Sequence, residues 1–409
     1  MPKCHGDTLL LHISKIPCEV LVKTELNKKY RIMNIVGARP NMVKMAPLMR
    51  AMKRIPELDP VLVHTGQHYD YLMSQVFFEQ LGMPAPNYNL EVGSGSQHDQ
   101  TAEIIKRFGE VVRKDRPDMV VVVGDVNSTI ACSLVAAKER IPLAHVEAGL
   151  RSGDRTMPEE INRLLTDSIS DLLFTTEESG NANLRREGVP ANKVFFVGNI
   201  MIDSLVQSIK TARESELAVN LALRRRGYGV LTLHRPANVD DVDKLRAVLL
   251  AVKEIARELP ILFPVHPRTQ ARIAAAGIED MHSWDGKRAI QGNGVWMMGP
   301  ATYLDFLGIV DGAALVITDS GGIQEESTFM GVACLTFRDN TERPATIEHG
   351  TNILVGTDPA ALLYHAAEVR RKMKLGQRSE YRIPPLWDGH AAERIVEQLH
   401  RHLIELSKS

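Results

Sequence analysis

The sequence predicts an α/β protein with two doubly wound parallel sheets that face each other across a cleft. From Arg31 onward, short runs of β-branched residues alternate with longer helical stretches. The short runs are apolar throughout, which is typical of parallel strands covered by helices on both faces. Two such series fit into 409 residues, because domains usually run to about 100–200 residues.

The first series contains six expected strands. They are Ile32–Gly37, Pro60–Thr65, Met119–Gly124, Pro142–Glu147, Leu172–Thr176 and Val194–Gly198. Expected helices between them include Met42–Arg54, Asp99–Lys114 and Val126–Arg140. Strands that alternate with helices in this way indicate a Rossmann-like sheet.

The second series repeats this architecture without an evident repeated sequence. Its expected strands are Gly229–His234, Ile261–His266, Val295–Gly299, Ala314–Asp319, Ala333–Phe337 and Ile353–Gly356, with helices at Val242–Glu258, Tyr303–Val310 and Gly322–Met330. We expect an N-terminal extension at 1–30, Rossmann-like domains at 31–203 and 204–385, and a helix within 386–409 that packs back across the domains.

Composition excludes several classes of partner and location. The formal net charge is -1, so no global field attracts nucleic acid or an anionic membrane. No apolar run approaches the roughly 20 residues that a membrane helix needs. The four cysteines form no CxxC pair and no zinc-like spacing, which favours reduced thiols in a cytoplasmic protein: they are Cys4, Cys18, Cys132 and Cys334.

Charged residues follow the first expected strand. Ligands of open parallel sheets bind beyond the carboxyl ends of the strands. There the sequence GARPNMVK places Arg39 and Lys44 around a turn that enters a helix. This arrangement suits a phosphate, although a helix start with a solvated arginine is an equal alternative. Neither GxGxxG nor a P-loop is present, so no dinucleotide or ATP fingerprint is found.

Carboxylates follow two further strands of the first series. Asp125 comes after the strand at Met119, where it can either cap the next helix or reach the cleft. Glu147 ends the next strand and should point into the cleft. Glu159 and Glu160 open a helix, where acids are favourable with the helix dipole; we take Glu160 as such a residue and Glu159 as a candidate for chemistry.

The second series carries histidines and a glycine-rich turn at its strand ends. His234 and His266 end two expected strands. In TDSGGIQEES, Ser320 can cap a helix that opens with Gly321–Gly322, and free N–H groups there suit a diphosphate. Glu326 lies one turn further on, where a carboxylate can hold ribose hydroxyls.

These segments together resemble the non-hydrolysing UDP-N-acetylglucosamine 2-epimerases, which have the GT-B fold. The resemblance covers Arg31 to the C-terminus and rests on GARPNMVKMAP, GQHYDYLM, GDVNST, HVEAGLRSGD, PEEINR, TLHRPAN, SGGIQEE and TERPATIEHGTN in this order. It implies a homodimeric isomerase that needs neither NAD nor metal and supplies surface polysaccharide precursors. It implies catalytic roles for Asp125, Glu147, Glu159 and His234, and nucleotide-sugar binding by Arg39, Lys44, Arg163, His266, Ser320, Glu326 and Arg343.

The expected reaction is elimination followed by re-addition. The C2 proton is not adjacent to a carbonyl, so loss of UDP from C1 must accompany its removal. Two proton transfers on opposite faces of the sugar need separate groups, and a carboxylate cluster whose members raise one another's pKa would supply them. We assign Asp125 to proton removal, and Glu147 and Glu159 to the return step.

Two departures from the family pattern leave the substrate and the regulation open. Asn41 and Ala345 stand where many members have glutamate, so a modified UDP-sugar is also a candidate substrate. Gln67 and His68 match a second substrate site of some members, although acids such as Asp99 nearby oppose a diphosphate. A hydrolysing epimerase, a GT-B glycosyltransferase and an inactive nucleotide-sugar sensor are also compatible with this sequence.

Overall fold

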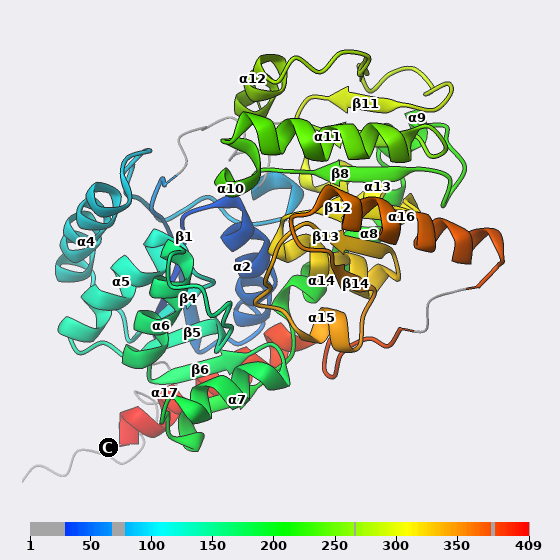
Figure 1. Ribbon diagram of the computed structural model, residues 1–409. Helices are drawn as coiled ribbons and strands as arrows, with labels where there is room; N and C mark the ends of the chain where they lie inside the picture. Colours follow the sequence, from blue (N-terminus) through cyan, green and yellow to red (C-terminus); the bar gives the residue numbers. More distant parts are fainter. Residues whose placement is uncertain (1–28, 68–77, 266, 378–380, 409) are drawn as a thin grey trace, which may run out of the picture.

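The computed structural model describes residues 29–67, 78–265, 267–377 and 381–408 (Figure 1). It contains two seven-stranded sheets in which every strand pair is parallel. The expected fold class of two parallel-sheet α/β domains is therefore confirmed.

The first sheet has the order β3-β2-β1-β4-β5-β6-β7. Its strands are β1 (Tyr30–Val36), β2 (Leu58–His64), β3 (Tyr88–Asn89), β4 (Met119–Val123), β5 (Leu143–Ala148), β6 (Leu172–Thr175) and β7 (Val194–Phe196). The helices connecting them are α2 (Arg39–Met52), α4 (Gln97–Lys114), α5 (Asn127–Lys138), α6 (Pro158–Ile169) and α7 (Glu178–Arg186), with a 3-10 turn at Ala191–Lys193.

Successive residues of the first sheet enter two different cores. In β4, Val121 and Val123 pack in the core that contains α2, whereas Val120 and Val122 pack in the core that contains α4 and α5. Alternate side chains of a strand point to opposite faces, so helices bury this strand on both sides. This burial explains why β4 consists of one methionine and four valines.

The second sheet has the order β10-β11-β9-β8-β12-β13-β14. Its strands are β8 (Gly229–Thr232), β9 (Ile261–Pro264), β10 (His282–Ser283), β11 (Val295–Met298), β12 (Leu315–Thr318), β13 (Ala333–Thr336) and β14 (Asn352–Leu354). The helices of this half and of the C-terminal segment are α8 (Ile200–Arg213), α9 (Glu216–Asn220), α10 (Pro236–Val239), α11 (Val242–Ala256), α12 (Pro267–Ala275), α13 (Tyr303–Gly312), α14 (Gly321–Met330), α15 (Ala345–Glu348), α16 (Pro359–Lys374) and α17 (Ala391–Lys408).

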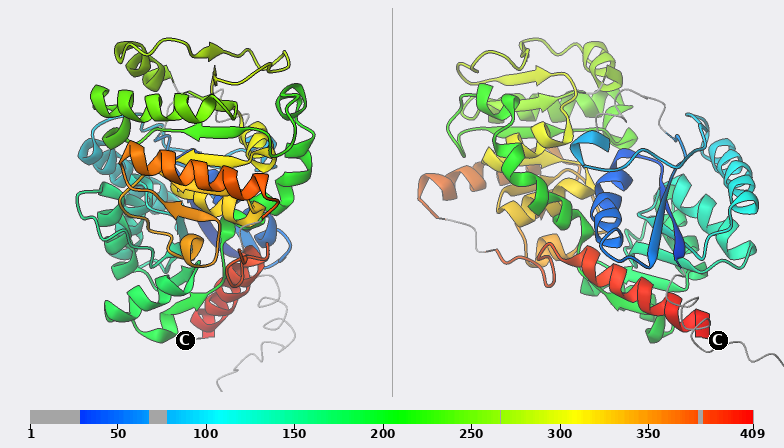
Figure 2. Two further views of the ribbon diagram at one scale, coloured as in Figure 1. Left: turned by 45° about the vertical axis from the view of Figure 1, so that its right-hand side comes forward. Right: turned by 180° about the vertical axis from the view of Figure 1, so that it is seen from behind.

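The last helix, α17, returns to the first half of the molecule (Figure 2). Its apolar residues, among them Ile395 and Leu399, share a core with α2. Asp203 of α8 accepts bonds from the first N–H groups of the helix, those of Ala391 (3.2 Å) and Ala392 (2.8 Å). None of the described helices has both the length and the apolar character needed to cross a bilayer.

Trp387 anchors the chain just before α17. Its side chain is buried and its indole N–H donates to the carbonyl of Thr176 at 3.0 Å. We expect Trp387→Ala to lower the free energy of unfolding by about 3–5 kcal/mol, because it removes a large buried side chain. Trp387→Phe should lose only about 1 kcal/mol, the value of the hydrogen bond. Calorimetry of both variants tests this, and equal losses would show that the hydrogen bond rather than the packing anchors the segment.

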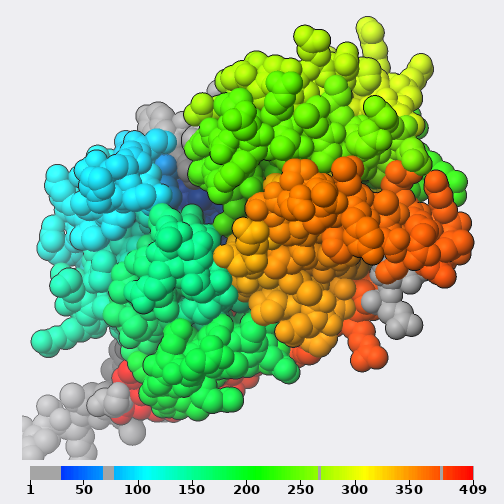
Figure 3. All heavy atoms as spheres, viewed as in Figure 1, coloured from blue at the N-terminus to red at the C-terminus, as the bar shows by residue number. Residues whose placement is uncertain are grey.

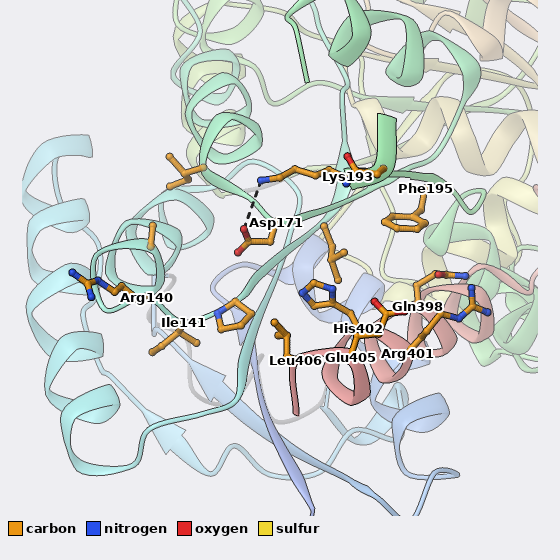
Figure 4. A pocket seen from close by; sticks show the side chains of 15 residues that line it. Arg140, Ile141, Asp171, Lys193, Phe195, Gln398, Arg401, His402, Glu405 and Leu406 are labelled. Carbon is orange, nitrogen blue, oxygen red and sulfur yellow. Dashed lines mark ion pairs between the residues drawn. The ribbon is translucent and has the colours of Figure 1, made fainter. Parts of the chain in front are cut away.

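A cavity of ≈ 820 Å³ lies between α17 and the amino-terminal ends of β5, β6 and β7 (Figure 4). Ile141, Asp171, Lys193, His402 and Leu406 are among its lining residues. This end of a parallel sheet is opposite to the one where ligands bind. The cavity is therefore separate from the candidate site described next.

Candidate active site

The candidate site lies where the carboxyl ends of the two sheets face each other, at a groove between the halves (Figure 3). Asp125 follows β4 and Glu147 lies near the end of β5 in the first half. His234 follows β8 and Ser320 follows β12 in the second. Arg343 precedes α15 and donates to Glu147 at 2.6 Å, so a direct ion pair joins the halves within the site.

Glu147 is held in an unusual backbone conformation. Its φ is +74°, in the left-handed region that non-glycine residues rarely adopt. The pairing register of β5 with β6 shifts between Val146 and Ala148, so Glu147 is the extra residue of a bulge. Bulges and strained residues are frequent next to active sites, where they redirect a side chain.

The Glu147 carboxylate is buried between two cations. It pairs with Lys44 of α2 and with Arg343. Burial raises the pKa of the Glu147 carboxyl, but Lys44 and Arg343 outweigh burial and leave the pKa below its usual value. The expectation that crowded carboxylates raise one another's pKa is therefore wrong for Glu147, because its closest charged neighbours are cations.

Arg343 connects a larger group of buried acids. Besides Glu147, its guanidinium contacts Glu325 at 2.9 Å and Glu342 at 2.7 Å. Arg338 also pairs with Glu342, at 2.8 Å. Burial opposes ionisation of Glu342, but Arg343 and Arg338 hold the pKa of that carboxyl far below its usual range. Arg343 is thus a buried cation shared by three carboxylates, and these ion pairs hold the buried side of the site in place.

Arg163 of α6 links two acids of the first half. It pairs with Asp125 and, at 2.5 Å, with Glu160. Glu160 also accepts bonds from the N–H groups of Ser152 and Gly153, both at 3.0 Å. Glu160 is thus more than an acid that favours the helix dipole, because it anchors both Arg163 and the loop after β5. Asp125 keeps 28% of its side chain exposed.

His234 and Glu159 face the groove with less burial. The ring of His234 is 58% exposed, and its Nδ1 lies 2.8 Å from the buried carboxylate of Asp319. Asp319 also accepts the N–H of Arg235 at 2.9 Å. Glu159 is half-buried in the first turn of α6, and its charge acts on Arg235 across the groove. This geometry orients the His234 ring and leaves its Nε2 edge toward open space.

The N-terminus of α14 has a backbone that a ligand could approach closely. Ser320 is the N-cap residue, and its side chain makes no capping bond. A Cβ at Gly321 would lie 2.7 Å from Glu342 Oε1 and 2.9 Å from Arg343 Nη1, so any larger residue would displace these paired side chains. Gly322 follows in the first turn, whose N–H groups have no side-chain cap. Such a turn provides donors for an anion.

Glu326 is a buried carboxyl on the next turn of α14. Burial raises its pKa to about 8, against the opposing effect of the Tyr303 hydroxyl. The group is therefore mostly neutral at pH 7 in the ligand-free protein. A neutral carboxyl can donate one bond and accept others, which suits the hydroxyls of a ribose.

The pKa of Glu326 predicts a pH-dependent stability. Its folded value of about 8 exceeds the ordinary value of 4.5, so stability falls as pH rises between these values, because only the unfolded chain ionises freely. The full effect is roughly 5 kcal/mol at most. We expect Glu326→Gln to be more stable than the wild type at pH 8 and nearly equal to it at pH 4.5.

Calorimetry of the ligand-free proteins across this pH range measures the difference. Glu397→Gln is the control, because the Glu397 side chain is 67% exposed and its replacement should give no such trend. A Glu326→Gln variant that is less stable than the wild type at pH 8 would show that Glu326 is ionised and held by partners.

The remaining predicted site residues have mixed outcomes. Arg39 is half-buried at the first position of α2. His266 and His68 lie outside the described residues. Gln67 is buried and accepts a bond from the Ser128 hydroxyl at 2.8 Å, and Asp99 is exposed on α4. Within the described ranges, no three His, Cys, Asp or Glu side chains are grouped so that they could bind a metal ion.

Several residues of the site were not predicted from the sequence. Asp319, Glu325 and Glu342 contact predicted residues directly, and His145 and Asp167 pair with each other near the bulge at Glu147. Asp319, Glu325 and Glu342 stand one or two positions from residues that were singled out. The signal available in the sequence was an acidic residue next to a residue already singled out at a strand end, a glycine turn or a loop. Their partners lie far along the chain, and local sequence does not identify them.

Comparison with known proteins identifies the family. Residues 50–400 match the family model described as UDP-N-acetylglucosamine 2-epimerase. The chain is 41% identical over 370 residues to the UDP-N-acetylglucosamine 2-epimerase of Methanocaldococcus jannaschii, covering 89% of this chain and 97% of that one. It is 37% identical to the UDP-2,3-diacetamido-2,3-dideoxy-D-glucuronate 2-epimerase of Pseudomonas aeruginosa, over 90% of this chain and 99% of that one.

Solved structures agree with this assignment. The crystal structure of the M. jannaschii epimerase in complex with UDP-GlcNAc and UDP superposes with a TM-score of 0.80 at 40% identity, covering 91% of this chain and 99% of that one. The family whose motifs the sequence resembles is thus confirmed by sequence and by fold. The chain belongs to the UDP-N-acetylglucosamine 2-epimerase family.

Proposed function

We propose that the protein interconverts UDP-N-acetylglucosamine and UDP-N-acetylmannosamine by reversible elimination of UDP. The observation that carries this proposal is the meeting of Asp125 and Glu147 with Lys44, Arg163 and Arg343 at the facing carboxyl ends of the two sheets. Proton transfer at C2 needs carboxylates, and departure of a diphosphate from C1 needs positive charge. Membership of the family supports the same substrate.

In the forward step, a carboxylate removes the proton from C2 of the sugar. The electron pair of that C–H bond forms the C1=C2 double bond, the C1–O bond breaks, and UDP leaves with its pair. We assign proton removal to Asp125, because it is the most exposed of the paired acids around Arg163 and can reach a sugar in the groove. His234, braced by Asp319, faces the same groove and would stabilise the departing diphosphate.

In the return step, a proton reaches C2 from the other face and the UDP oxygen re-forms its bond to C1. Glu147 and Glu159 are our candidates for this delivery. The α14 turn at Ser320, Gly321 and Gly322 would hold the diphosphate, and Glu326 the ribose. Arg39 and His266 would make further contacts to the nucleotide sugar. We further propose a homodimer that acts in the cytoplasm, needs no cofactor and supplies polysaccharide precursors.

Proton NMR in D2O tests the reaction. We expect UDP-N-acetylglucosamine to give UDP-N-acetylmannosamine with deuterium at C2 and no accumulating UDP. Free N-acetylmannosamine with one equivalent of UDP would instead make the protein a hydrolysing epimerase. An unchanged spectrum would exclude this substrate.

A modified UDP-sugar is the second candidate substrate. The similarity to the P. aeruginosa enzyme spans nearly the whole chain, and that enzyme's named substrate is a diacetamido uronate. Ala345 also stands where many members of the family have glutamate, and removal of an acid favours an anionic sugar. The kcat/KM values for the two UDP-sugars decide which one is the substrate. If kcat/KM is higher for the uronate than for UDP-N-acetylglucosamine, the uronate becomes the proposed substrate.

A further inference from the structure

A buried histidine lies directly behind the two acids assigned to the reaction. His145 of β5 is fully buried, and both ring nitrogens have a partner. Its Nδ1 lies 2.6 Å from Asp167 Oδ1, and its Nε2 lies 2.9 Å from the carbonyl oxygen of Gly124. Gly124 immediately precedes Asp125, and His145 stands two positions before Glu147. The imidazole therefore contacts the backbone just before Asp125, and His145 itself belongs to the strand that presents Glu147.

The two partners of His145 are both hydrogen-bond acceptors. A carbonyl oxygen only accepts, so Nε2 must carry a proton. Asp167 is also an acceptor, because Arg151 at 2.7 Å and the N–H of Gly149 at 3.0 Å both donate to its other oxygen. Burial raises the pKa of Asp167, but His145 and Arg151 outweigh burial and lower it. Each ring nitrogen of His145 therefore faces an acceptor, and this geometry favours a proton on both nitrogens.

Asp167 also joins the two sides of the bulge at Glu147. It binds the ring of His145 before the bulge and the N–H of Gly149 after it. Gly149 has a φ of +80°, and a Cβ there would lie 2.5 Å from the carbonyl oxygen of Gly180. The turn after Glu147 is therefore fixed from both sides. A residue with a φ of +74° keeps that conformation only when its surroundings hold it.

We propose that His145 is a positioning residue, held as an imidazolium by Asp167, which keeps the backbone of Asp125 and Glu147 in the arrangement needed for proton transfer. The proposal rests on the proposed function for its kinetic consequence. Its structural consequence, the double protonation of His145, does not depend on any substrate. The charge of His145 also lies close enough to Glu147 to favour the ionised form of that acid.

Asp167→Asn separates positioning from simple packing. Asparagine can still accept from Gly149 or Arg151, while its NH2 group donates to a neutral His145 Nδ1, so the shape is kept and the charge is lost. We expect kcat for UDP-N-acetylglucosamine to fall about 10–100-fold, with KM within about threefold of the wild type. Asp203→Asn is the matched control, because Asp203 is equally buried and binds two backbone N–H groups away from the site.

Nitrogen-15 NMR of the ligand-free protein tests the imidazolium directly at neutral pH. The signal of His145, assigned by its loss in His145→Gln, should show two protonated nitrogens in the wild type and one in Asp167→Asn. A single protonated nitrogen in the wild type would overturn the proposal. His145→Gln should show the same fall in kcat, and it replaces Asp167→Asn if that variant does not fold.

The kinetic outcomes distinguish the two proposals. If the wild type does not turn over UDP-N-acetylglucosamine, the proposed function fails, and the NMR result still decides the state of His145. If the wild type turns over the substrate and Asp167→Asn keeps its kcat, the positioning role is wrong. A rise in KM with an unchanged kcat would also contradict it, because that pattern indicates lost binding.

Discussion

Asp125→Asn is expected to lower kcat for epimerisation by about 10²–10⁴-fold, the usual contribution of a positioned acid or base. Asparagine has nearly the same shape, and the bond from Asn162 to the Asp125 backbone carbonyl at 2.8 Å does not depend on the side chain. Arg163 also keeps its pair with Glu160. The loss should therefore appear in kcat, with little change in the affinity for UDP.

Two measurements on Asp125→Asn decide its role. Steady-state kinetics give the fall in kcat, and deuterium wash-in at C2 of UDP-N-acetylglucosamine reports proton removal followed by return of a deuteron to the same face. Wash-in that falls together with kcat supports Asp125 as the base, whereas wash-in at the wild-type rate would assign that step to another acid. Asp280→Asn serves as control, because the Asp280 side chain is 89% exposed and far along the chain from the site.

The sequence was sufficient to predict the sheet cores and one edge strand of each sheet, but not the other edge strand. Strands such as β4 are buried on both faces, and this burial produces an unbroken apolar run. The edge strands β3 and β10 have two residues each and were not predicted. Two residues are too few to give a period, and their pairing depends on neighbours supplied by the rest of the fold.

Prediction of the site had a similar limit. Residues at strand ends, such as Asp125 and Glu147, were found because the ends of parallel strands converge. Lys44, Arg163 and Arg343 were also predicted as site residues, but their pairing with these acids was not, since Arg343 lies 196 positions after Glu147 and no local pattern connects the two. The sign of the pKa shift of Glu147 was consequently wrong, because it depends on those cations.

Arg343→Met is expected to cause the largest loss of stability. The substitution removes the paired cation of buried Glu325 and leaves Glu147 and Glu342 with one cation each, Lys44 and Arg338. Removal of one partner from a buried ion pair costs about 3–5 kcal/mol. Calorimetry should therefore show a large fall in the thermal midpoint at neutral pH. Arg213→Met is the matched control with a small expected effect, because Asp311 keeps its second partner, Arg225.

The deficit of Arg343→Met should shrink as the pH falls. In the wild type, the pKa values of Glu147 and Glu342 are lowered, so these acids stabilise the folded protein at pH values above the ordinary glutamate pKa of about 4.3. Without Arg343, only Lys44 and Arg338 oppose burial, so both pKa values rise, and protonation at lower pH then removes part of the penalty for buried charge. The midpoints of variant and wild type should therefore converge toward pH 4. A deficit that stays constant with pH would mean that Arg343 stabilises the protein by packing, and that Glu147 and Glu342 are not charged around it.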